Sequence, residues 1–286
     1  MKILSDFDGV WTDQAEEAAA IREHFDARLS ALCGRVVQGE LERLLVSIRA
    51  RPEEYGWAPE GRITAYVDED PLLATSALAL HLDRAGGPLR DAVARAGFES
   101  ATAFANRCFL DAMARFREHH SAEVVRGSLD TLRELAGLGA EVVIVSNSPP
   151  DKIVHWFARA GVPVDGPEAL LRVRGNAQKW HTASATCDVL AGRALYVDRP
   201  KYRQVLEEER PDLVIGDVYS LDLALPARLR RERAAGAPRT LVLRRHPHTP
   251  DWITQDRAGG AIDLFVAGVQ ELPALAREFA ASGARP

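Results

Sequence analysis

The stretch KILSDFDGV at residues 2–10 decides the fold class of this chain. Its first residues form a short apolar run typical of a buried strand, and Gly9 is a turn residue that ends the strand region. Asp6 and Asp8 therefore lie where a strand passes into a loop, and in an open parallel sheet ligands bind at that end of the strands. Two carboxylates this close repel each other, and Mg²⁺ favours such carboxylates together with a substrate phosphate. A turn that merely caps the next helix is the alternative, because Asp and Gly are common turn residues.

The composition is that of an ordinary globular protein. The chain has 286 residues, of which 47% are apolar and 27% charged. Its net charge of −5 argues against a nucleic-acid partner, and no stretch reaches the roughly 20 apolar residues that a membrane span needs. Three widely spaced cysteines form no metal or redox pattern, and no leader pattern precedes Asp6. We therefore expect a cytoplasmic protein that binds neither nucleic acid nor membrane.

The chain divides into a helical block and an alternating block. Between residues 15 and 121 apolar residues recur at intervals of three and four, which predicts amphipathic helices with candidate breaks at Gly34 and Gly39. After this block, β-branched runs alternate with helical segments, which predicts a parallel sheet. The runs expected to be strands are 141–145, 162–164, 194–197, 213–215, 240–243 and 264–266; a helix is expected over 167–171, and 172–192 show no clear pattern. The sequence thus predicts an α/β, Rossmann-like core (1–14 and 122–286) with an inserted, mostly α-helical cap (15–121).

Polar side chains follow three of the expected strands. Asp6 and Asp8 follow the first strand, Ser146 and Asn147 follow the run at 141–145, and Asp217 follows the run at 213–215. Because the carboxyl ends of parallel strands share one edge, these side chains are expected to converge. Carboxylates, a hydroxyl and a nearby lysine are a set that can hold Mg²⁺ and a phosphate.

These residues resemble the motifs of the haloacid dehalogenase superfamily of phosphotransferases. The first motif of that family, a strand followed by D-x-D-x-[TV], matches residues 6–10, and the second, a strand that ends in Ser or Thr, matches Ser146. The third, a Lys before the last acidic loop, is matched here to Lys201. The fourth, Gly-Asp with a further acid, is matched to Asp217 and Asp222. The matches span the core in the order of the family.

The resemblance implies the chemistry of the two aspartates. Asp6 is expected to be the nucleophile that forms an aspartyl phosphate. Asp8 is expected to protonate the leaving oxygen and then to act as the base for the hydrolytic water. Mg²⁺ is the expected cofactor, bound by Asp6, by the backbone carbonyl of Asp8 and by Asp217.

The resemblance also implies which groups bind the phosphate. Ser146, Lys201 and the loop amides at Phe7 and Asn147 are expected to stabilise charge on the transferring phosphoryl group. Asp222 is expected to orient Lys201 or to lie behind the metal ligands. An N-cap or a solvated helix position is the alternative for Asp222.

Other basic residues compete with these assignments. Lys201 is preferred because it precedes the strand of Asp217 by one short helix, whereas Lys152 and Lys179 are expected at the surface. Residues 246–248, His-Pro-His, have no third ligand nearby in sequence and are expected to form an exposed turn.

Several branches of the family are less compatible with the sequence. Asp8 argues against a dehalogenase, which lacks an acid two residues after the nucleophile. Residues 14–121 contain no lysine, which argues against the branch that uses a cap lysine to hydrolyse phosphonates. A phosphomutase would need acid–base or phosphate-binding groups in the cap. The cap residues that could serve are expected at the surface instead; they are Arg22, His24, Arg62 and His81.

The sequence therefore predicts a Mg²⁺-dependent phosphatase for a small phosphorylated metabolite. A phosphomutase, or a binding or regulatory protein that keeps the fold without catalysis, is the alternative. The sequence identifies neither the substrate nor the oligomeric state.

Overall fold

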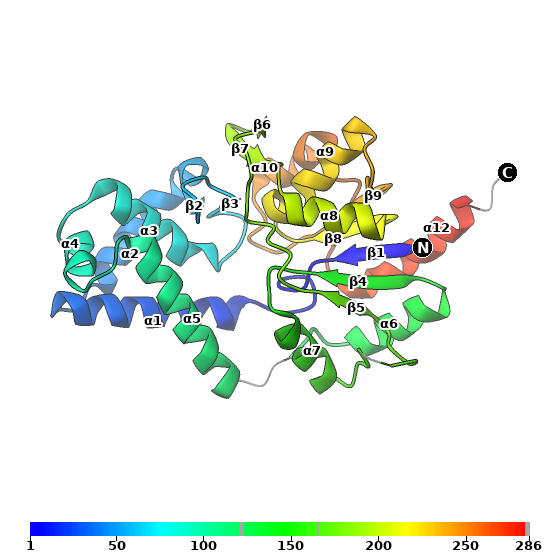
Figure 1. Ribbon diagram of the computed structural model, residues 1–286, viewed down its shortest axis with the longest axis horizontal. Coiled ribbons are helices and arrows are strands. Elements are labelled where there is room, and N and C mark those ends of the chain that lie inside the picture. The colour runs from blue at the N-terminus through cyan, green and yellow to red at the C-terminus, as the bar shows by residue number, and fades with distance from the viewer. Residues whose placement is uncertain (120–122, 165, 284–286) are drawn as a thin grey trace. The chain divides into compact units, whose positions relative to one another are not determined.

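The computed structural model describes residues 1–119, 123–164 and 166–283, and it divides into two compact units (Figure 1). One unit is formed by Met1–Asp13 with Ala122–Pro286, and the other by Gln14–Ser121.

A six-stranded parallel sheet forms the first unit and confirms the predicted α/β class. Its strand order is β10-β9-β8-β1-β4-β5, so the N-terminal strand lies in the interior of the sheet. The strands are β1 (Lys2–Ser5), β4 (Glu141–Val145), β5 (Arg172–Arg174), β8 (Leu213–Gly216), β9 (Thr240–Arg244) and β10 (Leu264–Val266).

The register of β1 places the polar strand ends at one edge. Leu4 lies opposite Val143 of β4 on one side and opposite Val214 of β8 on the other. The backbone N–H of Asp6 donates to the carbonyl of Ile215 at 2.9 Å. The loops that follow β1, β4 and β8 therefore begin level with one another, as the sequence predicted.

Helices connect the strands of this unit and follow the last strand. They are α6 (Ser128–Gly137), α7 (Pro150–Arg159), α8 (Pro200–Glu209), α9 (Ala224–Glu232), α10 (Asp251–Thr254), α11 (Arg257–Gly260) and α12 (Leu272–Gly283). The apolar face of α7 is buried through Ile153, Trp156 and Phe157. The rings of Trp156 and Phe157 lie 5.9 Å and 5.4 Å from the ring of Phe7, so this helix packs directly beneath the first loop.

Residues 160–199 differ from the expectation. No strand forms at 162–164, where Pro163 lacks a backbone donor, and no helix forms at 167–171. The sheet is instead extended by β5, in which two of the three residues are arginines, so its sequence lacks the apolar pattern of a buried strand. The strand predicted at 194–197 exists as β7 (Arg193–Tyr196), but it pairs with β6 (Cys187–Leu190) in a separate antiparallel hairpin.

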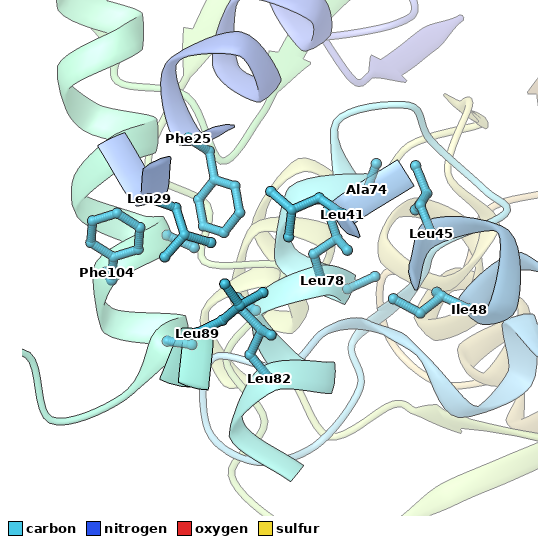
Figure 2. Packing of buried hydrophobic residues seen from close by; sticks show 14 of the residues in the cluster. Phe25, Leu29, Leu41, Leu45, Ile48, Ala74, Leu78, Leu82, Leu89 and Phe104 are labelled. Atoms are coloured by element: carbon cyan, nitrogen blue, oxygen red, sulfur yellow. The ribbon is translucent and has the colours of Figure 1, made fainter. Parts of the chain in front are cut away.

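The second unit is mostly helical, as predicted for the insertion between β1 and β4. It contains α1 (Ala15–Cys33), α2 (Gln38–Arg49), α3 (Leu73–Ala85), α4 (Pro88–Arg95), α5 (Ala101–His119), and a small sheet of β2 (Gly56–Trp57) and β3 (Ala65–Tyr66). Gly34 ends α1 in the left-handed region at φ +63°. Figure 2 shows the shared core, in which Phe25 of α1 faces Phe104 of α5 at 5.5 Å between ring centroids. A function of this unit as a lid stays a prediction.

A search of the described residues for membrane-spanning helices finds none with the length and hydropathy required.

Candidate active site

The loop after β1 is a tight turn. The backbone N–H groups of Val10 and Trp11 both donate to the carbonyl of Phe7, at 3.2 Å and 2.8 Å. Gly9 has φ +73°, and a β-carbon built on it would lie 1.9 Å from Oδ2 of Asp217. Only glycine fits both this conformation and this close approach. The turn thereby brings the loop of Asp6 and Asp8 against Asp217.

Two residues at the carboxyl end of β9, Arg244 in the strand and His246 after it, contact this turn. Nη1 of Arg244 donates to the carbonyls of Gly9 and Val10, at 2.9 Å and 2.8 Å. Nε2 of His246 lies 2.8 Å from the carbonyl of Gly9 and 3.8 Å from Oδ2 of Asp217. Burial and the Arg244 guanidinium lower the pKa of His246, which favours a neutral ring that donates to this carbonyl. The prediction of an exposed turn is therefore wrong for half-buried His246, although His248 is exposed.

Lys179 is the lysine that contacts the predicted nucleophile. Its Nζ lies 2.7 Å from Oδ1 of Asp6 and 2.7 Å from Oδ1 of Asp222, and the side chain is only 2% exposed. Burial opposes the charged form, but the carboxylates of Asp222 and Asp6 raise the pKa of Lys179, so the ammonium stays charged. Asp222 was expected to orient Lys201 or to lie behind the metal ligands; in the structure its carboxylate instead holds Lys179.

The segment after β5 delivers Lys179 by docking on the loop after β4. The N–H of Asn176 donates to the carbonyl of Ser148, and the N–H of Ala177 donates to that of Ser146, both at 2.9 Å. Oδ1 of Asn147 accepts the backbone N–H of Lys179 at 2.7 Å. A β-carbon on Gly175 would lie 2.7 Å from the Ser148 carbonyl, so glycine permits this close docking.

The assignment of Lys201 to the site is therefore a correction. Lys201 is exposed in the first turn of α8, whereas Lys152 and Lys179, expected at the surface, are both buried. The error arose because residues 172–192 lacked a recognisable strand, so that the lysine after β5 had no assigned place at the sheet edge. The one available signal was Gly175-Asn176, a turn pair that follows a short run containing Val173.

Asp8 is surrounded by hydrogen-bond donors. Lys152 Nζ contacts Oδ1 at 2.8 Å, and Oδ2 accepts from Ser148 Oγ at 2.7 Å and from Ser146 Oγ at 3.2 Å. Burial alone would raise the pKa of Asp8, but the Lys152 ammonium and the two hydroxyls lower it below its usual value. Ser146 thus lies at the site as predicted, while Lys152 and Ser148 were not predicted there.

The other predicted phosphate contacts have structural partners. The ring of Phe7 is buried against α7, so only its backbone could meet a ligand. Asn147 uses its side-chain carbonyl to hold Lys179. A role of either backbone amide in binding phosphate stays a prediction.

A cluster of carboxylates could hold a metal ion. Asp6, Asp217 and Asp222 each offer one oxygen, and these three oxygens lie within 4.8 Å of one another. Asp222 is also held by Lys179 and by the backbone N–H of Val218 at 3.1 Å, so Asp6 and Asp217 are the better candidate ligands. Burial and the charge of Asp222 raise the pKa of Asp6 to about 8. A hard cation with oxygen ligands, such as Mg²⁺, fits this donor set and would relieve the repulsion.

Comparisons with known proteins give likeness at the level of structure. No family model matches the chain, and no curated protein sequence matches it. A protein from Thermotoga maritima proposed to be a β-phosphoglucomutase is 13% identical with a TM-score of 0.49, covering 97% of this chain and 98% of its own. YfnB from Bacillus subtilis, proposed to be a hydrolase of the haloacid dehalogenase type and crystallised with magnesium, is 13% identical with a TM-score of 0.47, covering 96% of this chain and 98% of its own.

A 2-haloacid dehalogenase from Pseudomonas syringae is 14% identical with a TM-score of 0.45, covering 97% of this chain and 98% of its own. The names of these solved structures include members of the family that the sequence motifs resemble. At these TM-scores the likeness carries no conclusion about activity or ligands, which must be argued from the residues of this chain.

Proposed function

We propose that this chain is a Mg²⁺-dependent phosphatase of the haloacid dehalogenase superfamily that acts on a small phosphorylated metabolite. One observation carries the proposal: Asp6, which directly follows the central strand β1, contacts the buried ammonium of Lys179 and forms a carboxylate cluster with Asp217 and Asp222. A carboxylate nucleophile beside a fixed cation and a candidate metal site is the arrangement that phosphoryl transfer through an acyl phosphate requires.

The proposed reaction has two steps. An oxygen of Asp6 attacks phosphorus, the bond from phosphorus to the leaving oxygen breaks, and Asp8 supplies the proton to that oxygen. Water then attacks the phosphorus of the aspartyl phosphate, Asp8 accepts the water proton, and inorganic phosphate leaves with Asp6 restored. The lowered pKa of Asp8 favours the carboxylate form that accepts this proton in the second step, whereas it disfavours the protonated form that the first step uses.

Asp6 and Asp217 would hold the metal ion. A bound Mg²⁺ supplies positive charge that screens the clustered carboxylates and the phosphate. Lys179 fixes one oxygen of Asp6, and Ser146 places its hydroxyl at the same edge of the sheet. These residues orient the nucleophile and the phosphoryl group.

Contacts inside the helical unit support hydrolysis over mutase activity. Arg22 pairs with Asp26 at 2.7 Å and with Glu42 at 3.1 Å. Nδ1 of His81 lies 3.1 Å from the hydroxyl of Tyr55. Two of the residues considered for a mutase therefore have structural partners within their own unit.

The test is phosphate release from a panel of sugar, polyol, nucleoside and acid phosphates, with Mg²⁺ and with EDTA. The wild type is expected to hydrolyse at least one compound only with Mg²⁺, and Asp6→Asn is expected to abolish this activity. Asp130→Asn, at an exposed position of α6, is the matched control. Activity that survives Asp6→Asn would refute the mechanism. No turnover together with no Mg²⁺-dependent rise in Tm would favour a non-catalytic protein.

A further inference from the structure

We propose that Lys152 is a positioning residue that holds the carboxylate of Asp8 in place for proton transfer. This inference rests on the proposed function, because it concerns the acid–base step of the same site. The motifs that define the site in sequence contain a single lysine. The structure places a second one there.

Lys152 is held in place by its helix. It is the third residue of α7, and its side chain is only 6% exposed. Its Nζ lies 5.4 Å from the ring centroid of Trp156 and 6.0 Å from that of Phe7. Both aromatic rings are buried in the core of the unit. The ammonium therefore has a defined position relative to the sheet.

The carboxylate of Asp8 is gripped from two sides. Lys152 binds Oδ1, whereas the hydroxyls of Ser148 and Ser146 bind Oδ2. The two hydroxyls alone leave the carboxylate free to swing about Oδ2. The contact at Oδ1 fixes its orientation, and a displacement of about 1 Å can cost 100-fold in rate at a reacting centre.

The two lysines of the site serve different aspartates. Lys179 contacts Asp6 and Asp222, while Lys152 contacts Asp8. A buried ion pair contributes little to stability compared with an apolar pair of similar size, because both charges lose their hydration. Fold stability alone therefore gives a weak reason for Lys152, and the orientation of Asp8 gives a better one.

The test is a double-mutant cycle on a substrate that the wild type hydrolyses. Lys152→Met is expected to lower kcat about 100-fold while KM changes less than about twofold, because the substrate contacts remain. Asp8→Asn is expected to lower kcat at least as much. The double variant Asp8→Asn/Lys152→Met is expected to equal Asp8→Asn, because without the carboxylate the lysine has nothing to position. Arg159→Met, which removes an exposed charge from the same helix, is expected to match the wild type.

The outcomes separate this inference from the proposed function. An inactive wild type would refute the proposed function itself. If the wild type is active, a normal kcat in Lys152→Met would overturn only the role of Lys152. The same holds if the kcat of the double variant falls by the product of the two single losses. A higher KM with unchanged kcat would also overturn it, since that is the mark of a substrate contact. If Lys152→Met alone does not fold, the comparison of Asp8→Asn with the double variant decides: equal kcat supports positioning, and a further loss of about 10-fold refutes it.

Discussion

The ammonium of Lys179 lies 2.7 Å from Oδ1 of Asp6, although 173 positions separate the two residues in the chain. The lysine arrives from the segment after the edge strand β5, which docks by backbone hydrogen bonds on the loop after β4. Asp222 accepts a hydrogen bond from the same ammonium, also at 2.7 Å. This contact chain joins the loops after four strands, β1, β4, β5 and β8, and it leads to predictions that differ from those of the sequence alone.

The two candidate lysines can be compared directly. Lys179→Met is expected to lower kcat/KM at least about 100-fold, because it removes a fixed charge at the reacting centre. Breaking a buried pair should also lower the free energy of unfolding by about 3–5 kcal/mol, measured by urea denaturation. Lys201→Met, at an exposed position, is expected to match the wild type in both measurements. A larger loss from Lys201→Met than from Lys179→Met would contradict the structure.

The close approach of Gly9 to Asp217 predicts a specific effect of a methyl group. Gly9→Ala is expected to weaken Mg²⁺ binding, measured by calorimetry, because its β-carbon would displace Asp217 Oδ2, 1.9 Å away. Gly139→Ala is the matched control, since Gly139 has a similar φ of +70° with no atom within 4 Å of the added carbon. The backbone strain, about 1 kcal/mol, should be shared by both variants. Equal Mg²⁺ affinity in the two variants would argue against Asp217 as a ligand.

The raised pKa of Asp6 predicts how Mg²⁺ and pH act together. With a pKa of about 8 in the folded protein, against an ordinary value of 3.8 for an aspartate side chain, Asp6 binds a proton more tightly when folded. Its contribution to stability is therefore present below about pH 4 and is lost as pH rises towards 8. Added Mg²⁺ should offset that loss, so the rise in Tm on adding Mg²⁺ is expected to be larger at pH 8 than at pH 5. Asp6→Asn should remove most of this difference; a difference that persists in the variant would point to another group.

Glu209 offers a test of the fold that leaves the site untouched. Its carboxylate accepts hydrogen bonds from Lys2, the first residue of β1, at 3.2 Å, and from Arg172 and Arg174, the first and last residues of β5, at 2.6 Å and 3.1 Å. Hydrogen bonds from Arg172 hold its pKa below the usual value, so its contribution is present near neutral pH and lost as pH falls.

Glu209→Gln is expected to lower the free energy of unfolding by about 1–3 kcal/mol at pH 7, with kcat unchanged. Glu208→Gln, at the exposed neighbouring position, should cost less. Equal free energies of unfolding in the two variants would show that the hydrogen bonds of Glu209 do not stabilise the edge strand β5.

Local sequence patterns predicted much of this molecule. The apolar runs gave β1, β4, β8, β9 and β10, and the polar residues after three of them, Asp6, Ser146 and Asp217, do meet at one edge. β5 was missed because its arginines pair with Glu209 and Glu208 of α8, so its side chains do not show the apolar pattern of a buried strand. The strand β7 was predicted, but its partner β6 and their separate hairpin were not. A strand pattern in the sequence does not reveal which sheet the strand joins.

The sequence by itself determined where the chain turns and which carboxylates end the central strand. Those features depend on neighbouring residues: the apolar run of β1, the glycine of the turn, and the spacing of Asp6 and Asp8. Only the tertiary structure decided which lysines enter the site and which aspartate each one serves. That choice depends on the docking of the segment after β5 and on the face that α7 turns to the core. Both arise from contacts between residues far apart in the chain, which the spacing of residues along the sequence does not predict.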